Sequence, residues 1–193
     1  MPATLRHAVL FVAVANLAYF SVEFVVALDI GSVSLFADSI DFLEDASVSL
    51  LIAIALNWSP RNRARLAMAL SAILLVPGLA AIWTAWTKLN TMLVPAPVPL
   101  STTGLGALAV NLTCAFILVR YRHHRGSLTR AAFLSARNDA LANVAIIAAG
   151  LLTALVWHSA WPDLLVGVGI VAMNADAARE VWTAAREEHG AAV

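Results

Sequence analysis

Hydrophobic residues fill six long stretches of this chain, and most charged residues collect between them. Each stretch holds about 20 residues, the length that a helix needs to cross the roughly 30 Å hydrocarbon core of a bilayer. The pattern therefore predicts six membrane-spanning helices that together use up the chain. We place them at about 8–28, 33–57, 66–87, 101–120, 131–156 and 162–182.

The composition agrees with an all-α integral membrane protein. Of the 193 residues, 61% are hydrophobic and 12% are charged, with a mean hydropathy of +0.83. A soluble domain carries about twice that charged fraction. We therefore expect residues 1–193 to form one six-helix transmembrane domain, with no soluble domain. The first apolar run exceeds the usual 7–15 residues of a leader core, so we expect no cleaved signal peptide. The lone Cys114 excludes an internal disulfide.

Positive charge is distributed unevenly between the two sides of the predicted membrane domain. Ten of the twelve Lys and Arg residues flank span ends that share one side, Lys88 lies on the other, and Arg137 falls within the fifth span. The positive-inside rule places the basic side and both chain termini in the cytoplasm. We expect a multi-pass protein of the cell (inner) membrane. All six tryptophans fall at span ends, as in an aromatic belt.

The connection between the third and fourth spans, residues 89–100, is rich in proline. It contains Pro95, Pro97 and Pro99. Proline has no amide hydrogen to donate within a helix. We therefore expect an extended loop over the whole connection.

Polar side chains interrupt the second and fifth spans at helical spacing. Residues three or four apart share one face of a helix. The residues that do so are Asp38, Asp41 and Asp45 in the second span and Ser135, Asp139 and Asn143 in the fifth. Glu44 lies off this face of the second span, about 100° from Asp45.

The acidic positions predict a cation site. A carboxylate within hydrocarbon is costly and generally marks a functional site. At about 1.5 Å per residue from the predicted span ends, Asp41, Asp45 and Asp139 can meet near the midplane. Either a cation neutralises these groups or they take up protons, and the two compete because ligands must lose protons to bind metal. The alternative is that these groups hold helices together by hydrogen bonds, a role more typical of Ser, Thr, Asn and Gln.

The first span carries a smaller polar face, formed by Asn16, Tyr19 and Glu23. Glu23 is either a proton acceptor or entry carboxylate, or else a buried hydrogen-bonding partner of another helix. The sequence favours neither alternative. In the fourth span, a thiolate ligand at Cys114 is conceivable, but a small buried cysteine is the commoner outcome.

These residues resemble the cation diffusion facilitator family of divalent-metal transporters. The resemblance extends over all six predicted spans. It is carried by Asn16, Glu23, residues 31–38, Asp41-xxx-Asp45, Ser135-xxx-Asp139, Asn143 and Trp161-Pro162-Asp163. The resemblance implies a tetrahedral site, built by one short motif on the second helix and one on the fifth, which exports Zn²⁺ or related ions in exchange for protons. Carried over by position, the metal ligands are Asp41, Asp45 and Asp139.

Two departures from the family pattern change the expectation. Ser135 stands where the family usually has His or Asp, so water, Asp38 or Asn138 is expected to complete the metal shell. Imidazole suits Zn²⁺ whereas oxygen ligands favour harder ions such as Mn²⁺, which weakens a zinc assignment. The family's cytoplasmic C-terminal domain, which commonly helps dimerisation, does not follow the last predicted span, although we still expect a homodimer. The candidates for auxiliary or proton-coupling roles are Asp38, Asn138, Asn143, Glu23 and Asn16.

The sequence therefore predicts a metal/proton antiporter that exports Zn²⁺, Co²⁺, Mn²⁺, Fe²⁺ or Cd²⁺ from the cytoplasm. The competing hypothesis is a metal-binding membrane subunit or sensor that does not transport. We expect no enzyme, since there is no HExxH motif and no histidine within a span, and no permanently bound cofactor. The expected partners are the metal cation, protons and the lipid bilayer. Nucleic acid is not expected, because the basic residues follow the membrane topology.

Overall fold

The structure is a computed structural model that describes residues 3–55, 62, 79, 82–119 and 127–173, with the backbone alone for helical residues 3–5, 52, 55 and 127–138. Its long helices are α1 (Ala3–Ile30), α2 (Val33–Ala55), α4 (Pro97–Val119) and α5 (Ser127–Leu155). Residues 82–91 and Trp161–Met173 are also helical. Every regular element among the described residues is a helix, and each of the six predicted spans contains one. The prediction of an all-α fold is confirmed.

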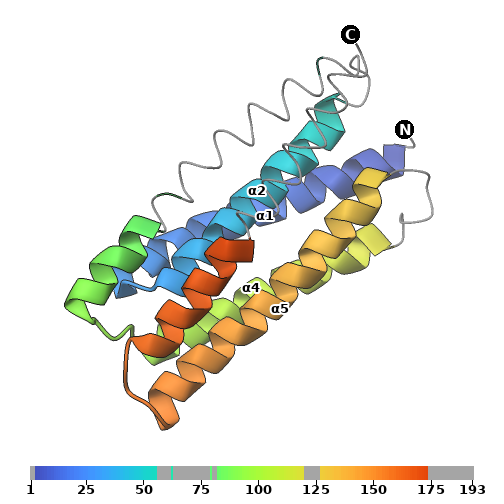
Figure 1. Cartoon of the computed structure of the whole chain (residues 1–193). Helices are drawn as coiled ribbons and strands as arrows, with labels where there is room; N and C mark the ends of the chain where they lie inside the picture. The colour runs from blue at the N-terminus through green and yellow to red at the C-terminus, as the bar shows by residue number, and fades with distance from the viewer. Residues whose placement is uncertain (1–2, 56–61, 63–78, 80–81, 120–126, 174–193) are drawn as a thin grey trace.

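The long helices lie side by side. α1 packs along α2, α4 packs along α5, and the two pairs meet through contacts of α1 with α4 and of α2 with α5. Figure 1 shows that α1 begins at the end of the bundle where α2 and α4 end and α5 begins. We call this the N-terminal end. The opposite end holds the α1–α2 turn and an ion pair between Lys88 and Asp163, and we call it the clasp end.

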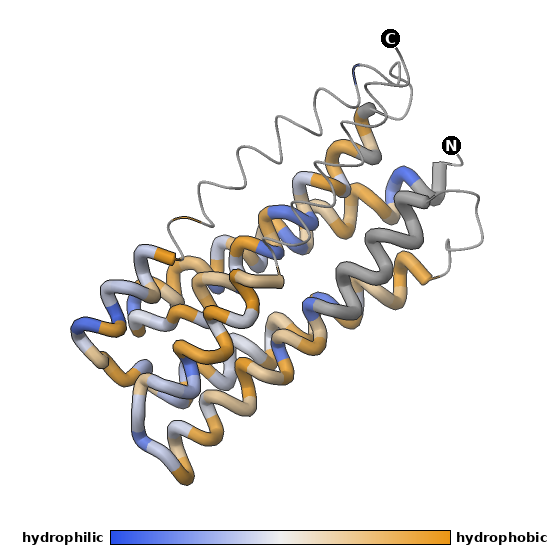
Figure 2. Tube along the Cα trace, viewed as in Figure 1, coloured by the Kyte–Doolittle hydropathy of each residue, from blue (hydrophilic) through white to orange (hydrophobic). Residues whose placement is uncertain are grey.

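The outward faces of the helices are apolar. More than half of the side-chain surface is exposed at Phe11, Val14 and Val25 on α1 and at Leu105 and Phe116 on α4. Figure 2 shows hydrophobic colour along much of α1, α2 and α4, interrupted by hydrophilic positions. Soluble proteins rarely expose contiguous apolar surface on this scale. Among the described residues, the helices able to cross a membrane by length and composition are Arg6–Ile30 and Pro97–Val119, while Asp139–Leu155 and Trp161–Met173 are shorter apolar helices.

The prediction of an extended loop over residues 89–100 is wrong at both ends. Helix covers its first three residues, and α4 covers its last four. Pro97 and Pro99 occupy the first turn of α4, where no N–H donor is needed. The helical ladder starts at Leu100, whose N donates to the oxygen of Ala96 at 3.1 Å. The prolines therefore start this helix instead of preventing it.

The other described helix ends lie within five residues of the predicted span ends. α1 begins five residues early and α5 four residues early. Four tryptophans are exposed near the clasp end, namely Trp83, Trp86, Trp157 and Trp161. The predictions for residues 56–57, 66–78 and 174–182, and for Trp58 and Trp182, lie outside the described residues.

A glycine turn reverses the chain between α1 and α2. Gly31 has φ 62°, a left-handed conformation that costs about 1–2 kcal/mol for a residue with a Cβ. The N of Ser32 donates to the oxygen of Ala27 at 2.9 Å, which closes the end of α1. Its Oγ accepts from the N of Leu35 at 3.1 Å, which caps the start of α2. Two residues thus end one helix and begin the next, and α2 runs antiparallel to α1.

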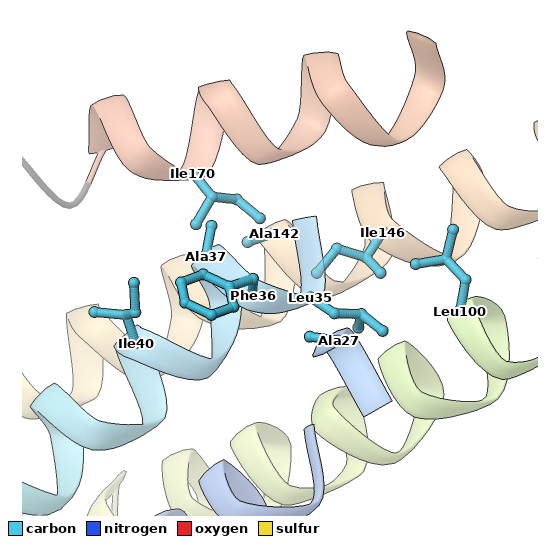
Figure 3. Close-up of a cluster of buried hydrophobic side chains, with 9 residues drawn as sticks. All are labelled: Ala27, Leu35, Phe36, Ala37, Ile40, Leu100, Ala142, Ile146 and Ile170. Carbon is cyan, nitrogen blue, oxygen red and sulfur yellow. The ribbon is translucent and has the colours of Figure 1, made fainter. Parts of the chain in front are cut away.

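A cluster of apolar side chains joins the helices near the clasp end. Figure 3 shows its buried members, which are Ala27, Leu35, Phe36, Ala37, Ile40, Leu100, Ala142, Ile146 and Ile170. They come from α1, α2, α4, α5 and the Trp161–Met173 helix. Between helices in a membrane, such contacts stabilise through close packing, since lipid tails are as apolar as the side chains.

A small residue lets the Trp161–Met173 helix approach the start of α2 closely. A Cβ placed at Gly167 would lie 2.7 Å from Val33 Cγ1 and 2.9 Å from Ser34 N. Glycine at such positions allows two helix backbones to approach. This contact brings Asp163, one turn earlier on the same helix, to the first turn of α2.

Candidate metal-binding site

A polar stripe runs along one face of α2. Its members are Ser34, Asp38, Asp41, Asp45 and Ser49, spaced three or four residues apart. Ser34 and Asp38 have no exposed surface, and Asp41 exposes 9%. Asp45 is half-buried and Ser49 is buried. The stripe therefore faces the other helices and not the lipid.

α1 and α5 present polar side chains to the stripe at the level of Asp38. Glu23 on α1 is an electrostatic neighbour of Asp38 and lies within hydrogen-bonding reach of it. On α5, Asn143 Nδ2 donates to Asp38 Oδ1 at 3.3 Å. One turn toward the N-terminal end, the Tyr19 and Phe42 ring centroids are 5.1 Å apart. Asp38 thus lies between α1 and α5.

The three aspartates predicted to bind metal lie along the contact between α2 and α5. Asp41 and Asp139 are electrostatic neighbours, and the Asp139 carboxyl lies within hydrogen-bonding reach of Asp45. Carboxylates this close repel one another unless a proton or a cation lies between them. Within the described residues, no three Asp, Glu, His or Cys side chains already form a metal cluster. The structure therefore gathers these aspartates without closing them into a finished site.

Three predicted or discussed positions on α5 lie outside the described side chains, namely Ser135, Arg137 and Asn138. Whether Ser135 or Asn138 completes the metal shell stays a prediction. Glu44, set apart from the acidic face by helical geometry, is half-buried and near enough to interact electrostatically with Asp41 and Asp139.

Several polar atoms in this interior have no hydrogen-bonding partner among the described residues. They are both side-chain polar atoms of Asn16, both Glu23 oxygens, Asp38 Oδ2 and Asn143 Oδ1. All four residues are fully buried. More than about 90% of buried polar groups in proteins are paired, and an unpaired one costs about 1–3 kcal/mol. The interior therefore holds unused capacity to bind a polar or charged ligand.

The remaining polar candidates are engaged in packing. Tyr19 donates its hydroxyl hydrogen to the oxygen of Thr103 at 2.6 Å, which joins α1 to α4. Cys114 is buried against Val12 and Leu118 in an apolar cluster. Its thiol thus lies where a small apolar side chain would pack, as the sequence favoured.

Another buried carboxylate, Asp163, lies at the clasp end, and five donors reach it. Oδ1 accepts from the Ser32 and Ser34 hydroxyls, each at 2.6 Å, and from the N of Ser34 at 3.3 Å. Oδ2 accepts from the N of Val33 at 2.8 Å and from Lys88 Nζ at 2.7 Å. The Asp163 side chain thus caps α2 from another helix.

Lys88 completes this network. Its Nζ also donates to the oxygen of Gly31 at 2.7 Å, so one ammonium joins the 82–91 helix to the α1–α2 turn and to Asp163. In the sequence, Lys88 indicated only topology, and Asp163 appeared only within the Trp161-Pro162-Asp163 segment of the family resemblance. The available signals were a lone basic residue on one side and two serines at a helix start. Neither signal identifies the partner.

Comparison with known proteins identifies the family. Residues 9–187 match the family of the cation efflux transmembrane domain. Similar proteins include the cation-efflux pumps FieF of Salmonella arizonae, Salmonella newport and Salmonella heidelberg. Each is 28% identical over 155 residues, covering 72% of this chain and 51% of the relative. The chain thus spans about half the length of the relatives that it matches. Because the family match covers most of its length, this chain belongs to the cation efflux family of transmembrane domains, named for membrane transport and not for catalysis.

Proposed function

We propose that this chain exports a divalent transition-metal cation from the cytoplasm in exchange for protons. The observation that carries the proposal is the buried acidic contact between α2 and α5. It gathers Asp41, Asp45 and Asp139 in the interior of a bundle whose outer faces are apolar. The relatives named as cation-efflux pumps support the direction of transport.

The chemistry of exchange follows from the acidic groups themselves. A bound divalent cation neutralises carboxylates that would otherwise repel one another, and it requires them to be deprotonated. When the cation leaves, protons take its place, because bare carboxylates are costly at this depth. Ser135, Asn138 or water completes the shell around Asp41, Asp45 and Asp139 in this proposal.

The oxygen-rich donor set bears on the choice of metal. Carboxylate and hydroxyl oxygens suit harder ions, and imidazole would suit Zn²⁺. We therefore place Mn²⁺ first among Zn²⁺, Co²⁺, Mn²⁺, Fe²⁺ and Cd²⁺.

The orientation, the domain organisation and the oligomeric state are part of the same proposal. The uneven distribution of Lys and Arg supports an inner-membrane protein whose N-terminal end and both termini face the cytoplasm. The apolar outer faces support one six-helix transmembrane domain. A homodimer rests on family resemblance alone, and light scattering of the purified full chain measures it.

The test is metal flux into proteoliposomes under an imposed pH gradient, with the five metals compared side by side. The wild-type protein should carry at least one of them, and Asp45→Ala should abolish that flux. Asp29→Ala is the matched control, because Asp29 is an exposed aspartate on α1.

Flux that persists unchanged in Asp45→Ala would overturn the site assignment. Metal binding without flux for any of the five metals would favour the non-transporting membrane subunit. Size-exclusion profiles establish that both variants are folded and inserted.

A further inference from the structure

Three buried, oxygen-bearing side chains from three helices meet at one level of the bundle. They are Glu23 on α1, Asp38 on α2 and Asn143 on α5, and none has exposed surface. Asn143 Nδ2 donates to Asp38 Oδ1 at 3.3 Å, and the Glu23 carboxyl lies within hydrogen-bonding reach of Asp38. Asp38 therefore connects the other two.

The acceptors at this level outnumber the donors. Four oxygens have no partner among the described residues, namely both Glu23 oxygens, Asp38 Oδ2 and Asn143 Oδ1. Asn143 Nδ2 is already used, by Asp38 and by the backbone oxygen of Asp139 at 2.6 Å. The neighbouring Tyr19 hydroxyl is likewise engaged, at 2.6 Å from a backbone oxygen of α4.

No described basic side chain balances the two carboxyls. Lys88 is the only buried Lys or Arg whose side chain the structure describes, and its ammonium is bound at Asp163. One proton shared between Glu23 and Asp38 would pair two of the four oxygens and leave two unpaired. A cation can be coordinated by all four oxygens at once.

We propose that Glu23, Asp38 and Asn143 form a second, oxygen-lined site for a hard divalent cation such as Mn²⁺. The three side chains offer neither a ring nitrogen nor a sulfur, which favours hard ions over soft ones. Asp38 is three residues from Asp41 and seven from Asp45, or about 4.5 and 10.5 Å along α2 toward the clasp end. The site is thus displaced outward from the three aspartates proposed as metal ligands.

In this proposal, the second site is an intermediate binding site for the cation between those aspartates and the clasp end. This role rests on the proposed transport function, whereas the binding itself does not. Leu35 and Phe36, two members of the apolar cluster in Figure 3, precede Asp38 on α2 by three and two residues, toward the clasp end. A cation released toward the clasp end therefore reaches the second site before it reaches Leu35 and Phe36.

The test is Mn²⁺ binding to the purified full chain in detergent, measured by electron paramagnetic resonance of the free ion. The double variant Asp45→Ala/Asp139→Ala removes two of the three aspartates proposed as metal ligands and should still bind one Mn²⁺ per chain. Adding Glu23→Gln should weaken the remaining binding by about tenfold or more. Asp29→Asn, an exposed change on the same helix, is the matched control and should leave binding unchanged.

Two results would overturn the second site. One is no Mn²⁺ binding in the folded double variant, and the other is residual binding that Glu23→Gln leaves intact, which would assign Glu23 a proton. If the double variant does not fold, Glu23→Gln and Asp38→Asn in the wild-type background should each lower bound Mn²⁺ by one equivalent, and unchanged binding would contradict the site. Mn²⁺ binding does not depend on transport, so the binding result can be interpreted even if the protein shows no flux.

Discussion

Asp163 and Asp38 are equally buried, but the fold satisfies them very differently. Neither has exposed surface. Asp163 accepts hydrogen bonds from two hydroxyls, two backbone N–H groups and the Lys88 ammonium. Asp38 accepts one described hydrogen bond from an N–H donor, that of Asn143, and its Oδ2 has no partner among the described residues.

This difference distinguishes a carboxylate that stabilises the fold from one that can still bind a proton or a cation. At the clasp end, charge and lone pairs are both balanced within the protein, so Asp163 holds the 82–91 helix, α2 and the last described helix together. At the level of Asp38, two carboxyls meet with no described cation beside them. Polar groups left in that condition are costly unless a proton or a cation arrives.

The largest effect on stability should come from breaking the network of hydrogen bonds around Asp163, including its ion pair with Lys88, which we call the clasp. Asp163→Asn removes the carboxylate charge and leaves the Lys88 ammonium buried without a counter-charge. Loss of one partner of a buried pair costs about 3–5 kcal/mol. We expect the free energy of unfolding in detergent to fall by that amount. Asp29→Asn should change it by less than about 0.5 kcal/mol, as exposed positions do. Equal stability of the two variants would show that the clasp does not hold the fold.

The same substitution at Asp38 should act in the opposite direction. In metal-free protein, Asp38→Asn replaces one of two buried carboxyls that meet with no described cation beside them. We expect the free energy of unfolding to rise by about 1–3 kcal/mol. Thermal unfolding with and without Mn²⁺ measures this change, and Mn²⁺ should stabilise the variant less than the wild type. A variant as destabilised as Asp163→Asn would remove the distinction between the two carboxylates.

The smallest effect should come from removing one donor of the clasp. Ser34→Ala deletes a hydroxyl that donates to Asp163 at 2.6 Å, while the backbone N of the same residue still donates at 3.3 Å. The expected loss is about 1 kcal/mol. Ser21→Ala is a matched control, because its exposed hydroxyl donates only within its own helix, to the oxygen of Leu17. Chemical denaturation of both variants gives the comparison. If Ser34→Ala lowered the free energy of unfolding as much as Asp163→Asn does, this would contradict the view that all five donors contribute to stabilising Asp163.

Much of the fold follows from local properties of the sequence. Hydropathy locates the helices because a membrane span needs about 20 apolar residues in a row. The nearness of Asp41 and Asp139 follows from the rise per residue along helices that run in opposite directions. The error at Pro97 has a local cause as well, since a proline in a first turn and a proline in a loop look alike in the sequence.

The clasp could not be predicted in this way. Asp163 binds Ser32 and Ser34, which lie 131 and 129 residues earlier in the chain, and no spacing rule connects them. The partnership of Asp38 with Asn143 depends on the register of α5 against α2, which local sequence patterns do not specify. Local spacing thus identified the polar residues, and long-range packing decided which of them are satisfied.

The most direct test of the account is whether Mn²⁺ binding releases protons. Calorimetric titration of the purified protein at pH 7, repeated in two buffers of different ionisation enthalpy, gives the number of protons released per ion bound. If the buried carboxyls exchange protons for a divalent cation, the wild type should release at least about one proton per ion, and Asp45→Ala should release fewer. Binding without proton release would contradict the account.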